Sequence, residues 1–249
     1  MAKWYDFDYE RRMRRDLPFY RACAEEGGGP VLELGAGTGR VSAYLARAGF
    51  DVTAVDLSEA MLERAETRRA KLGEAGDRIR LVRQDMAELT VRGRFGTVLV
   101  PFHSFHHLYS TSRQLAALRA IRRRLTERGI AVFVLFRPDI PQYQDYDSRL
   151  VVSYERTDRS SGNKVVQRFR MQCEFPRQMM YIDYYWDEYR GRRRINRDHA
   201  PMRWRWFHRY EFEHLLARAN LRPIRILGDY DSRPFDDRCE QMIFFAMRA

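Results

Sequence analysis

Short apolar runs alternate with stretches of helical period over the first half of the chain. The runs that predict strands are Val31 to Leu34, Val52 to Val55, Ile79 to Val82, Thr97 to Val100 and Ile130 to Phe136. The clearest predicted helix carries Leu115, Leu118, Ile121 and Leu125 on one face. Because strands that alternate with helices build a mostly parallel sheet covered on both faces, we predict a doubly wound α/β fold.

The rhythm changes at Pro138 and Pro141, where the pattern of strands alternating with helices stops. Three strand-like runs follow, at Val151 to Tyr154, Val165 to Met171 and Met179 to Tyr185, and they predict a small antiparallel sheet. A helix resumes near Tyr210, and the runs Ile224 to Leu227 and Met242 to Ala246 then close the main sheet, the last as a hairpin partner.

The sequence therefore predicts one domain over residues 1–249, built on a seven-stranded, mostly parallel, Rossmann-like sheet. A β-rich insertion over residues 138–206 follows the fifth strand. Ligands of open α/β sheets bind at the carboxyl ends of the strands, so we expect the insertion to cover a substrate there.

The formal net charge of +11 raises the hypothesis of a nucleic-acid partner. Of the 45 basic residues 42 are arginines, and they are spread along the chain, with the densest cluster at Arg192, Arg193, Arg194 and Arg197. Dispersed arginines are typical of solvated faces and surface ion pairs, so we expect no nucleic-acid partner.

The first sixteen residues are crowded with charges and lack the apolar stretch of a secretory signal. The longest apolar run, Ile130 to Phe136, is too short to span a bilayer. We expect a cytoplasmic protein without a membrane partner. Cys23, Cys173 and Cys239 are too widely scattered for a metal site, and we expect no metal.

The most specific motif is a strand ending in Glu33 and followed by Gly35, Gly37 and Gly39 ahead of a helix. Glycines at such a turn adopt strained dihedrals and let a ligand lie against bare backbone. A dinucleotide-binding turn needs another glycine three positions after Gly37, where this chain has Arg40, so that interpretation is disfavoured. A glycine turn required only for its shape is the structural alternative.

This block resembles the first motif of class I S-adenosylmethionine-dependent methyltransferases. Asp56 lies 21 residues after Gly35, at the distance from which a carboxylate accepts hydrogen bonds from both ribose hydroxyls. The resemblance implies that Met61 packs near the adenine, and that Asp85 accepts from the adenine amino group with Met86 against the ring. The cofactor contacts predicted in this way are Tyr9, Glu33, Gly35, Ala36, Gly37, Gly39, Arg40, Asp56, Leu57, Met61, Gln84, Asp85, Met86, Pro101 and Phe102.

Residues 101–108 follow the fourth strand and, by the resemblance, pass beside the sulfonium of the cofactor. They lack the Asn/Asp-Pro-Pro and Pro-Cys signatures of base-modifying enzymes and the Asp of metal-dependent catechol enzymes. A hydroxyl or an ammonium acceptor must lose a proton, for which a histidine is suited, and His103 is the predicted base. Each of His103, His106 and His107 has a helix-capping or loop-bonding alternative, and adjacent His106 and His107 diverge too far for a shared metal.

The segment Trp4 to Tyr9 resembles the opening helix of enzymes that N-methylate nucleotide-linked amino sugars, in which a tyrosine folds over the cofactor. Tyr9 is the better match and Tyr5 the second, and aromatic packing of a terminal helix is the alternative. The basic run Arg11 to Arg15 departs from that family, which leaves the partner of the cofactor carboxylate open. The resemblance spans residues 5–136 and resumes over 206–247.

These observations predict transfer of a methyl group from S-adenosylmethionine to a nitrogen or oxygen of a small molecule, with S-adenosylhomocysteine as product. An anionic or aromatic acceptor fits the predicted binding residues, which are His107, Tyr185, Trp186, Trp204 and Trp206. A tRNA methyltransferase and a non-catalytic cofactor-binding module are the alternatives. Monomer and homodimer are both open.

Overall fold

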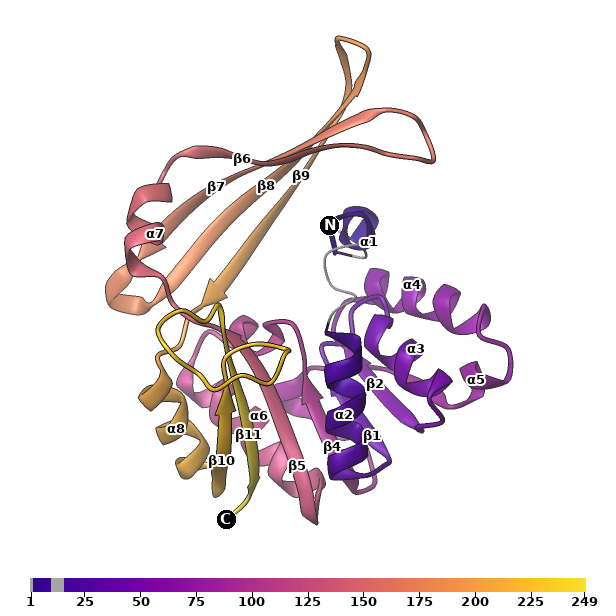
Figure 1. The fold of residues 1–249 in the computed structure, drawn as a ribbon, viewed down its shortest axis with the longest axis vertical. Helices are drawn as coiled ribbons and strands as arrows, with labels where there is room; N and C mark the ends of the chain where they lie inside the picture. The colour runs from indigo at the N-terminus through magenta and orange to yellow at the C-terminus, as the bar shows by residue number, and fades with distance from the viewer. Residues whose placement is uncertain (1, 10–15) are drawn as a thin grey trace. The chain divides into compact units, whose positions relative to one another are not determined.

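The computed structural model describes residues 2–9 and 16–249, with the side chains of Ala2 and Tyr9 left out. The chain divides into two compact units (Figure 1). The seven-stranded unit comprises residues 2–137 and 207–249, and the four-stranded unit comprises residues 138–206.

The seven-stranded unit alternates strands and helices as the hydrophobic pattern predicts. Its elements are α1 (Ala2–Tyr9), α2 (Leu17–Gly27), β1 (Val31–Leu34), α3 (Arg40–Arg47), β2 (Val52–Asp56), α4 (Glu59–Ala70), α5 (Glu74–Asp77), β3 (Ile79–Arg83), η1 (Met86–Glu88), β4 (Phe95–Val100), η2 (Ser104–His107), α6 (Thr111–Arg124), β5 (Leu125–Phe136), α8 (Arg209–Arg218), β10 (Leu221–Leu227) and β11 (Gln241–Arg248). The strand order is β10-β11-β5-β4-β1-β2-β3. Strand β11 runs antiparallel to both of its neighbours and the other pairs are parallel, which confirms the predicted fold class and the closing hairpin.

Helices cover the sheet on both faces, and alternate strand residues feed two separate cores. On one face Val31 and Val132 pack with Tyr20 of α2 and Leu45 of α3. On the opposite face the neighbouring strand residues pack with side chains of α6 and α8; this set includes Leu32, Phe133, Leu118, Ile121, Phe212 and Leu216. Because β1, β4 and the second half of β5 are buried on both faces, their mostly apolar runs are the strongest strand signal in the sequence.

The prediction for Leu125 was wrong. The leucine continues the apolar face of the preceding helix in the sequence, yet α6 ends at Arg124 and Leu125 has extended dihedrals, φ −68° and ψ 140°. Its fully buried side chain begins β5 and joins the same core that the helix contacts. Helical spacing of apolar residues does not mark where a helix ends, because a strand that follows directly can bury the next leucine equally well.

The four-stranded unit consists of α7 (Ile140–Tyr146), β6 (Leu150–Thr157), β7 (Lys164–Glu174), η3 (Phe175–Arg177), β8 (Met179–Arg190) and β9 (Arg193–Arg205). Its strands pair antiparallel in the order β6-β7-β8-β9. Strand β9 was not predicted. Arginines occupy most of its outward positions, and only Ala200 and Met202 are buried, so the sequence shows little alternation of apolar and polar residues.

Helix α7 was also missed, since Pro141 was interpreted as a break. Proline is tolerated in the first turn of a helix, where its missing N–H has no partner. Asp139 caps this helix by accepting a hydrogen bond from the Gln142 backbone at 3.1 Å. Within residues 2–9 and 16–249, no helix is both long enough and apolar enough to cross a lipid bilayer.

Candidate functional site

The glycine turn lies between β1 and α3, and its three glycines have φ values of 77°, 55° and 73°. The backbone N–H groups of Gly35 and Ala36 both donate to the Val55 carbonyl of β2, at 2.8 and 3.0 Å. A Cβ at Gly35 would lie 2.3 Å from Oγ of Ser104, closer than atoms can approach. This turn therefore excludes any L side chain at its first glycine.

The middle glycine of the turn faces an aromatic ring. A Cβ placed on Gly37 would lie 3.8 Å from ring atoms of Tyr5 in α1, and the Tyr5 ring makes an edge contact with Phe102 at 6.3 Å between centroids. Tyr5, which the resemblance ranked second, thus lies over the turn. The prediction for Tyr9 concerns a side chain outside the described part of the chain. A Cβ at Gly39 would lie 3.1 Å from Ala65 Cβ in α4, so that glycine permits close helix packing.

Asp56, the last residue of β2, holds the turn through its carboxylate. Oδ2 accepts a hydrogen bond from the Gly37 backbone N–H at 2.7 Å, and Oδ1 accepts from the Ser58 N–H at 2.8 Å. Ser58 in turn caps α4 through a hydrogen bond to Met61 N, which confirms the predicted N-cap. Each carboxylate oxygen has a second lone pair, so Asp56 can accept further hydrogen bonds while it holds the turn.

The acidic residue after β3 is already engaged within the protein. Asp85 accepts a charge-assisted hydrogen bond from the Arg113 guanidinium of α6, and its other oxygen accepts from the Ala87 N–H at 2.8 Å. Gln84 accepts from the Thr90 backbone N–H at 3.1 Å and so shapes the same loop. A hydrogen bond from an adenine amino group to Asp85 remains a prediction, and it would have to share the carboxylate with Arg113.

The other residues predicted around the cofactor are placed as follows. Met86 starts η1 and packs against the core, within 3.8 Å of the Cβ position on Gly35. Met61 is half-buried in the first turn of α4, whereas the preceding Leu57 is 62% exposed. Pro101 is buried and Phe102 is half-buried at the carboxyl end of β4. The glycine turn, Asp56 and the end of β4 thus lie at the carboxyl edge of adjacent strands, where this fold class binds ligands.

Glu33 lies beneath the turn, and its carboxyl is buried. It accepts a hydrogen bond from the hydroxyl of Ser42 in α3. Burial raises the pKa of the Glu33 carboxyl from 4.5 to about 7, against the opposing effect of the Ser42 hydrogen bond. Because burial disfavours the charged carboxylate, Glu33 lowers the stability of the folded chain when it is ionised. Direct contact of Glu33 with the cofactor stays a prediction.

Arg40, at the start of α3, forms a two-point ion pair with Asp16, with N–O distances of 2.7 and 2.6 Å. Asp16 is 1% exposed, so most of its surface lies against protein. The predicted contact of Arg40 with the cofactor would have to compete with Asp16 for the guanidinium.

The rings of Tyr20 and Tyr230 lie 5.9 Å apart between centroids, and burial raises the pKa of both hydroxyls.

Helix α1 is fastened to the turn through Asp6, which the sequence analysis did not single out. The Thr38 hydroxyl donates to Asp6 Oδ1 at 2.7 Å. Arg64 and Arg68 of α4 form ion pairs with the same carboxylate at 3.2 and 3.1 Å, and Arg68 also donates to the Thr38 carbonyl. The only hint in the sequence is that Asp6 lies within the aromatic segment Trp4 to Tyr9, from which only the tyrosines were predicted to contact the cofactor.

The segment after β4 has an unusual backbone. Phe102 and His103 have φ values of 45° and 64°, in the left-handed region that side chains other than glycine rarely adopt. His103 N donates to the Val134 carbonyl of β5 at 3.2 Å, and Nε2 lies 2.7 Å from Oε1 of Gln241 at the start of β11. Burial of its ring lowers the pKa of His103 to about 4, so the imidazole is neutral at pH 7.

The two other histidines of the segment differ from His103. His106 is fully buried, stacks on Phe136 at 3.9 Å between centroids and accepts a hydrogen bond from the Phe136 backbone N–H through Nε2. This is the structural alternative that the sequence analysis left open. His107 is exposed. No group of three or more potential metal ligands lies together in the described part of the chain.

The aromatic residues predicted to bind the acceptor do not share one surface of the four-stranded sheet. Successive strand residues point to opposite faces, so Tyr185 and Trp186 diverge. Tyr185 lies on the outward face, stacked on His199 at 4.8 Å, whereas Trp186 is 1% exposed on the inward face with Trp204. Trp206 follows β9 and packs against Tyr143 at 5.5 Å between centroids.

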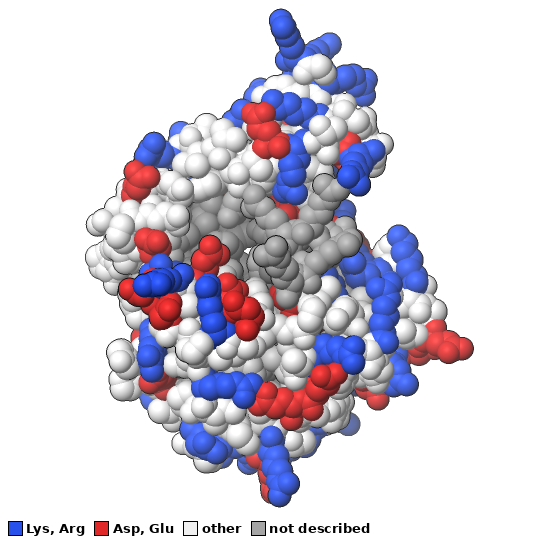
Figure 2. Space-filling view, viewed as in Figure 1, with Lys and Arg blue, Asp and Glu red and all other residues white. Residues whose placement is uncertain are grey.

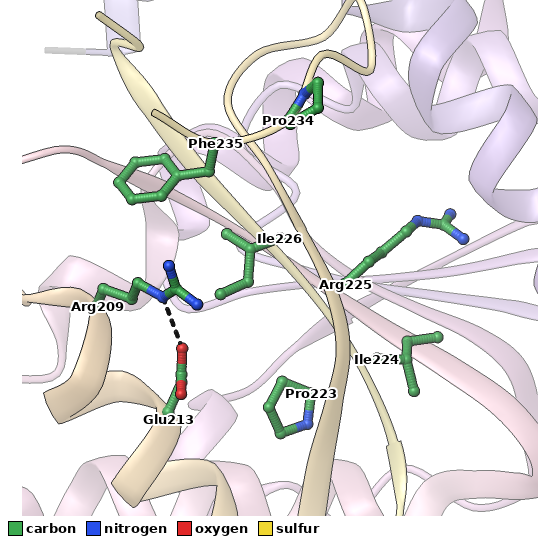
Figure 3. Close-up of a pocket in the computed structure, with 8 residues that line it drawn as sticks. All are labelled: Arg209, Glu213, Pro223, Ile224, Arg225, Ile226, Pro234 and Phe235. Atoms are coloured by element: carbon green, nitrogen blue, oxygen red, sulfur yellow. Dashed lines mark hydrogen bonds and ion pairs between the residues drawn. The ribbon is translucent and has the colours of Figure 1, made fainter. Parts of the chain in front are cut away.

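A pocket of about 330 Å³ lies beside β10 in the seven-stranded unit (Figure 3). Arg209 and Glu213 of α8 line it as an ion pair, opposite Ile226 and Phe235. Strand β10 is an edge strand, four strand positions from β1. Strands lie about 4.8 Å apart, which separates this pocket from the glycine turn by roughly 19 Å. The pocket is therefore distinct from the candidate cofactor site.

The seven-stranded sheet has a reversed final strand, a glycine turn after its first strand and a carboxylate at the end of its second. This is the arrangement expected from the resemblance to S-adenosylmethionine-dependent methyltransferases. Residues 31–129 match the family described as methyltransferase domain. Over these residues the chain is therefore similar in sequence to a methyltransferase domain.

Among curated relatives, the glycine/sarcosine N-methyltransferase of Aphanothece halophytica is 30% identical over 172 residues, which cover 66% of this chain and 62% of the relative. The chain spans about half the length of the first curated relatives it matches, from 41% to 62%.

Two solved structures share the fold. The CcbJ methyltransferase from Streptomyces caelestis has a TM-score of 0.80 and 22% identity, covering 94% of this chain and 89% of its own. CalS10, an amino pentose methyltransferase from Micromonospora echinaspora, has a TM-score of 0.75 and 20% identity, covering 98% of this chain and 96% of its own.

Proposed function

We propose that this protein transfers a methyl group from S-adenosylmethionine to an amine nitrogen of a small molecule. The match of residues 31–129 to the methyltransferase domain carries the proposal, because it spans the turn and the strand end that Asp56 joins. The acceptor class is supported by the named relatives, a glycine/sarcosine N-methyltransferase and an amino pentose methyltransferase.

The residues of the turn fit such a cofactor. Bare backbone at Gly37 lies next to the Tyr5 ring, so both can line a site for such a cofactor. Asp56 keeps accepting capacity toward the hydroxyls of a ribose. When bound, the cofactor supplies a methyl group on a positively charged sulfur, which needs only an aligned nucleophile.

His103 is proposed to orient the acceptor amine. With a pKa of about 4, its imidazole is neutral at pH 7 and adds no positive charge beside a cationic methyl donor. A neutral ring accepts a hydrogen bond from the amine and so directs the nitrogen lone pair, but it is a weak base toward an ammonium ion. We therefore assign it alignment of the uncharged amine.

The test is release of S-adenosylhomocysteine from labelled S-adenosylmethionine with nucleotide-linked amino sugars, glycine, sarcosine, phenols and tRNA. Turnover with an amine is the expected result. Turnover with a phenol or with tRNA, and with no amine, would contradict the proposed amine acceptor. Cofactor binding with no turnover on any amine would favour a binding module. Asp56→Ala is the test variant, and Asp51→Ala is the matched control, because Asp51 is exposed at the other end of the same strand.

A further inference from the structure

Two neighbouring histidine rings use the same ring nitrogen in opposite ways. His103 Nε2 lies 2.7 Å from Oε1 of Gln241, and an amide oxygen only accepts, so this arrangement of the amide assigns the ring proton to Nε2. His106 Nε2 instead accepts from the backbone N–H of Phe136 at 3.3 Å, so its proton must be on Nδ1. The two rings, 5.7 Å apart between centroids, are thus expected to be opposite tautomers.

Gln241 is held in place by the strands on which it lies. It is the first residue of β11 and pairs with Phe136 at the end of β5. The preceding segment is fixed by Arg137, whose backbone N–H donates to the Glu240 carbonyl at 2.8 Å and whose Nε donates to the Cys239 carbonyl at 2.6 Å. The amide therefore approaches His103 from an ordered strand end and not from a free loop.

The position of the His103 ring is fixed as well. Phe102 and His103 both lie in the left-handed region, and such backbone strain persists only where the surroundings enforce it. The ring of His103 stacks on Phe102 at 5.1 Å and meets the edge of Phe136 at 5.2 Å. Strain of this kind concentrates at functional sites, where it presets the orientation of a side chain.

We propose that Gln241 is a positioning residue that fixes His103 as the tautomer protonated at Nε2. Nδ1 is then the ring nitrogen that accepts a hydrogen bond from the acceptor amine. This assignment of Nδ1 rests on the proposed function, whereas the tautomer itself does not. Since Gln241 lies 138 residues after His103, no local motif marks the pair.

The experiment is long-range ¹H–¹⁵N NMR of the imidazoles in the full-length ¹⁵N-labelled protein at pH 7, with assignments from His103→Gln and His106→Gln. The expected spectrum shows His103 protonated at Nε2 and His106 protonated at Nδ1. In Gln241→Leu, the His103 signals should shift toward a mixture of tautomers while those of His106 stay unchanged. The matched control is Gln144→Leu, because Gln144 is exposed in α7. His103 protonated at Nδ1 in the wild type, or unaltered in Gln241→Leu, would overturn the inference.

A second variant keeps the test independent of any loss of stability. In Gln241→Glu a carboxylate replaces the amide and should raise the pKa of His103 from about 4 by roughly 1 to 3. An unchanged pKa would show that residue 241 does not contact the ring.

With any amine that the wild type methylates, Gln241→Leu should lower kcat at least about tenfold and leave cofactor affinity unchanged. A shifted tautomer with full kcat would refute the positioning role. If both histidines have the expected tautomers but no amine is methylated, the proposed function is refuted and the tautomer assignment stands.

Discussion

The buried acid beneath the glycine turn makes the stability of the protein depend on pH in a predictable direction. Burial raises the pKa of Glu33 to about 7 in the folded chain, whereas the unfolded chain keeps the usual 4.5. Between these values the folded state binds more protons than the unfolded state, so this group lowers stability as pH rises. The loss is absent below pH 4.5 and complete above pH 7.

The size of the effect follows from the two pKa values. Each pKa difference of one corresponds to 1.36 kcal/mol, so the rise from 4.5 to about 7 corresponds to about 3 kcal/mol above pH 7. Glu33→Gln removes the titration and keeps a side-chain amide that can bond the Ser42 hydroxyl. We expect the variant to gain about 3 kcal/mol relative to the wild type between pH 4.5 and pH 8.

The assay is urea unfolding of both proteins at several pH values, with the difference in free energy of unfolding plotted against pH. Other titrating groups are common to both proteins and cancel in that difference. If the two stability curves run parallel from pH 4.5 to pH 8, Glu33 titrates normally in the folded chain and the account of its burial is wrong.

Three further substitutions test the turn and the residues around it. Gly35→Ala should destabilise the protein by roughly 2 to 4 kcal/mol in urea unfolding, because the new Cβ meets Ser104 at 2.3 Å, whereas Gly49→Ala, with positive φ but open space, should cost only about 1 kcal/mol. Asp56→Ala should weaken S-adenosylmethionine binding by about 1–3 kcal/mol in calorimetry, and unchanged affinity would refute the ribose contact. Tyr5→Ala should weaken the same binding by about 1 kcal/mol while Tyr5→Phe keeps it, since a stacked ring and not the hydroxyl makes the contact.

The sheet and the glycine turn were predictable because their signals are local. Buried strands such as β1 and β4 are short and mostly apolar, and the turn requires glycine at positions whose φ is positive. The outward strand β9 and the proline-started helix α7 were not predictable from periodicity, because arginines conceal the alternation of β9 and Pro141 resembles a break.

The partners of the site residues were harder to infer than the residues themselves. Asp56 ends β2 and could be predicted as a site residue from its spacing to Gly35 and its place at the strand end. Its hydrogen bond to Gly37, the ion pair of Asp85 with Arg113 and the contact of Gln241 with His103 all join segments that only the folded chain brings together. A single sequence contains no signal for contacts between side chains so far apart along the chain.

The partners of the arginines could not be inferred from the sequence either. On the face drawn in Figure 2, Lys and Arg side chains of the seven-stranded unit are interspersed with Asp and Glu and do not gather in a single stripe. In the four-stranded unit, Arg168, Arg194 and Arg197 converge on the buried carboxylate of Asp187, and the hydrogen bond from Arg197 lowers the pKa of that carboxylate. Part of the arginine cluster noted in the sequence therefore serves an internal ion-pair network.

The energetics of α1 connect the fold to the proposed reaction. An eight-residue helix is unstable by itself in water, so its order depends on what it contacts. The ion pairs of Asp6 with Arg64 and Arg68 are partly exposed, and such pairs contribute about 0–1 kcal/mol each. The order of α1 therefore also depends on the hydrogen bond from the Thr38 hydroxyl to Asp6 and on the buried side chain of Trp4. A ligand that contacts both the Tyr5 ring and the glycine turn would add to these contacts, so we expect cofactor binding and the ordering of α1 to favour each other.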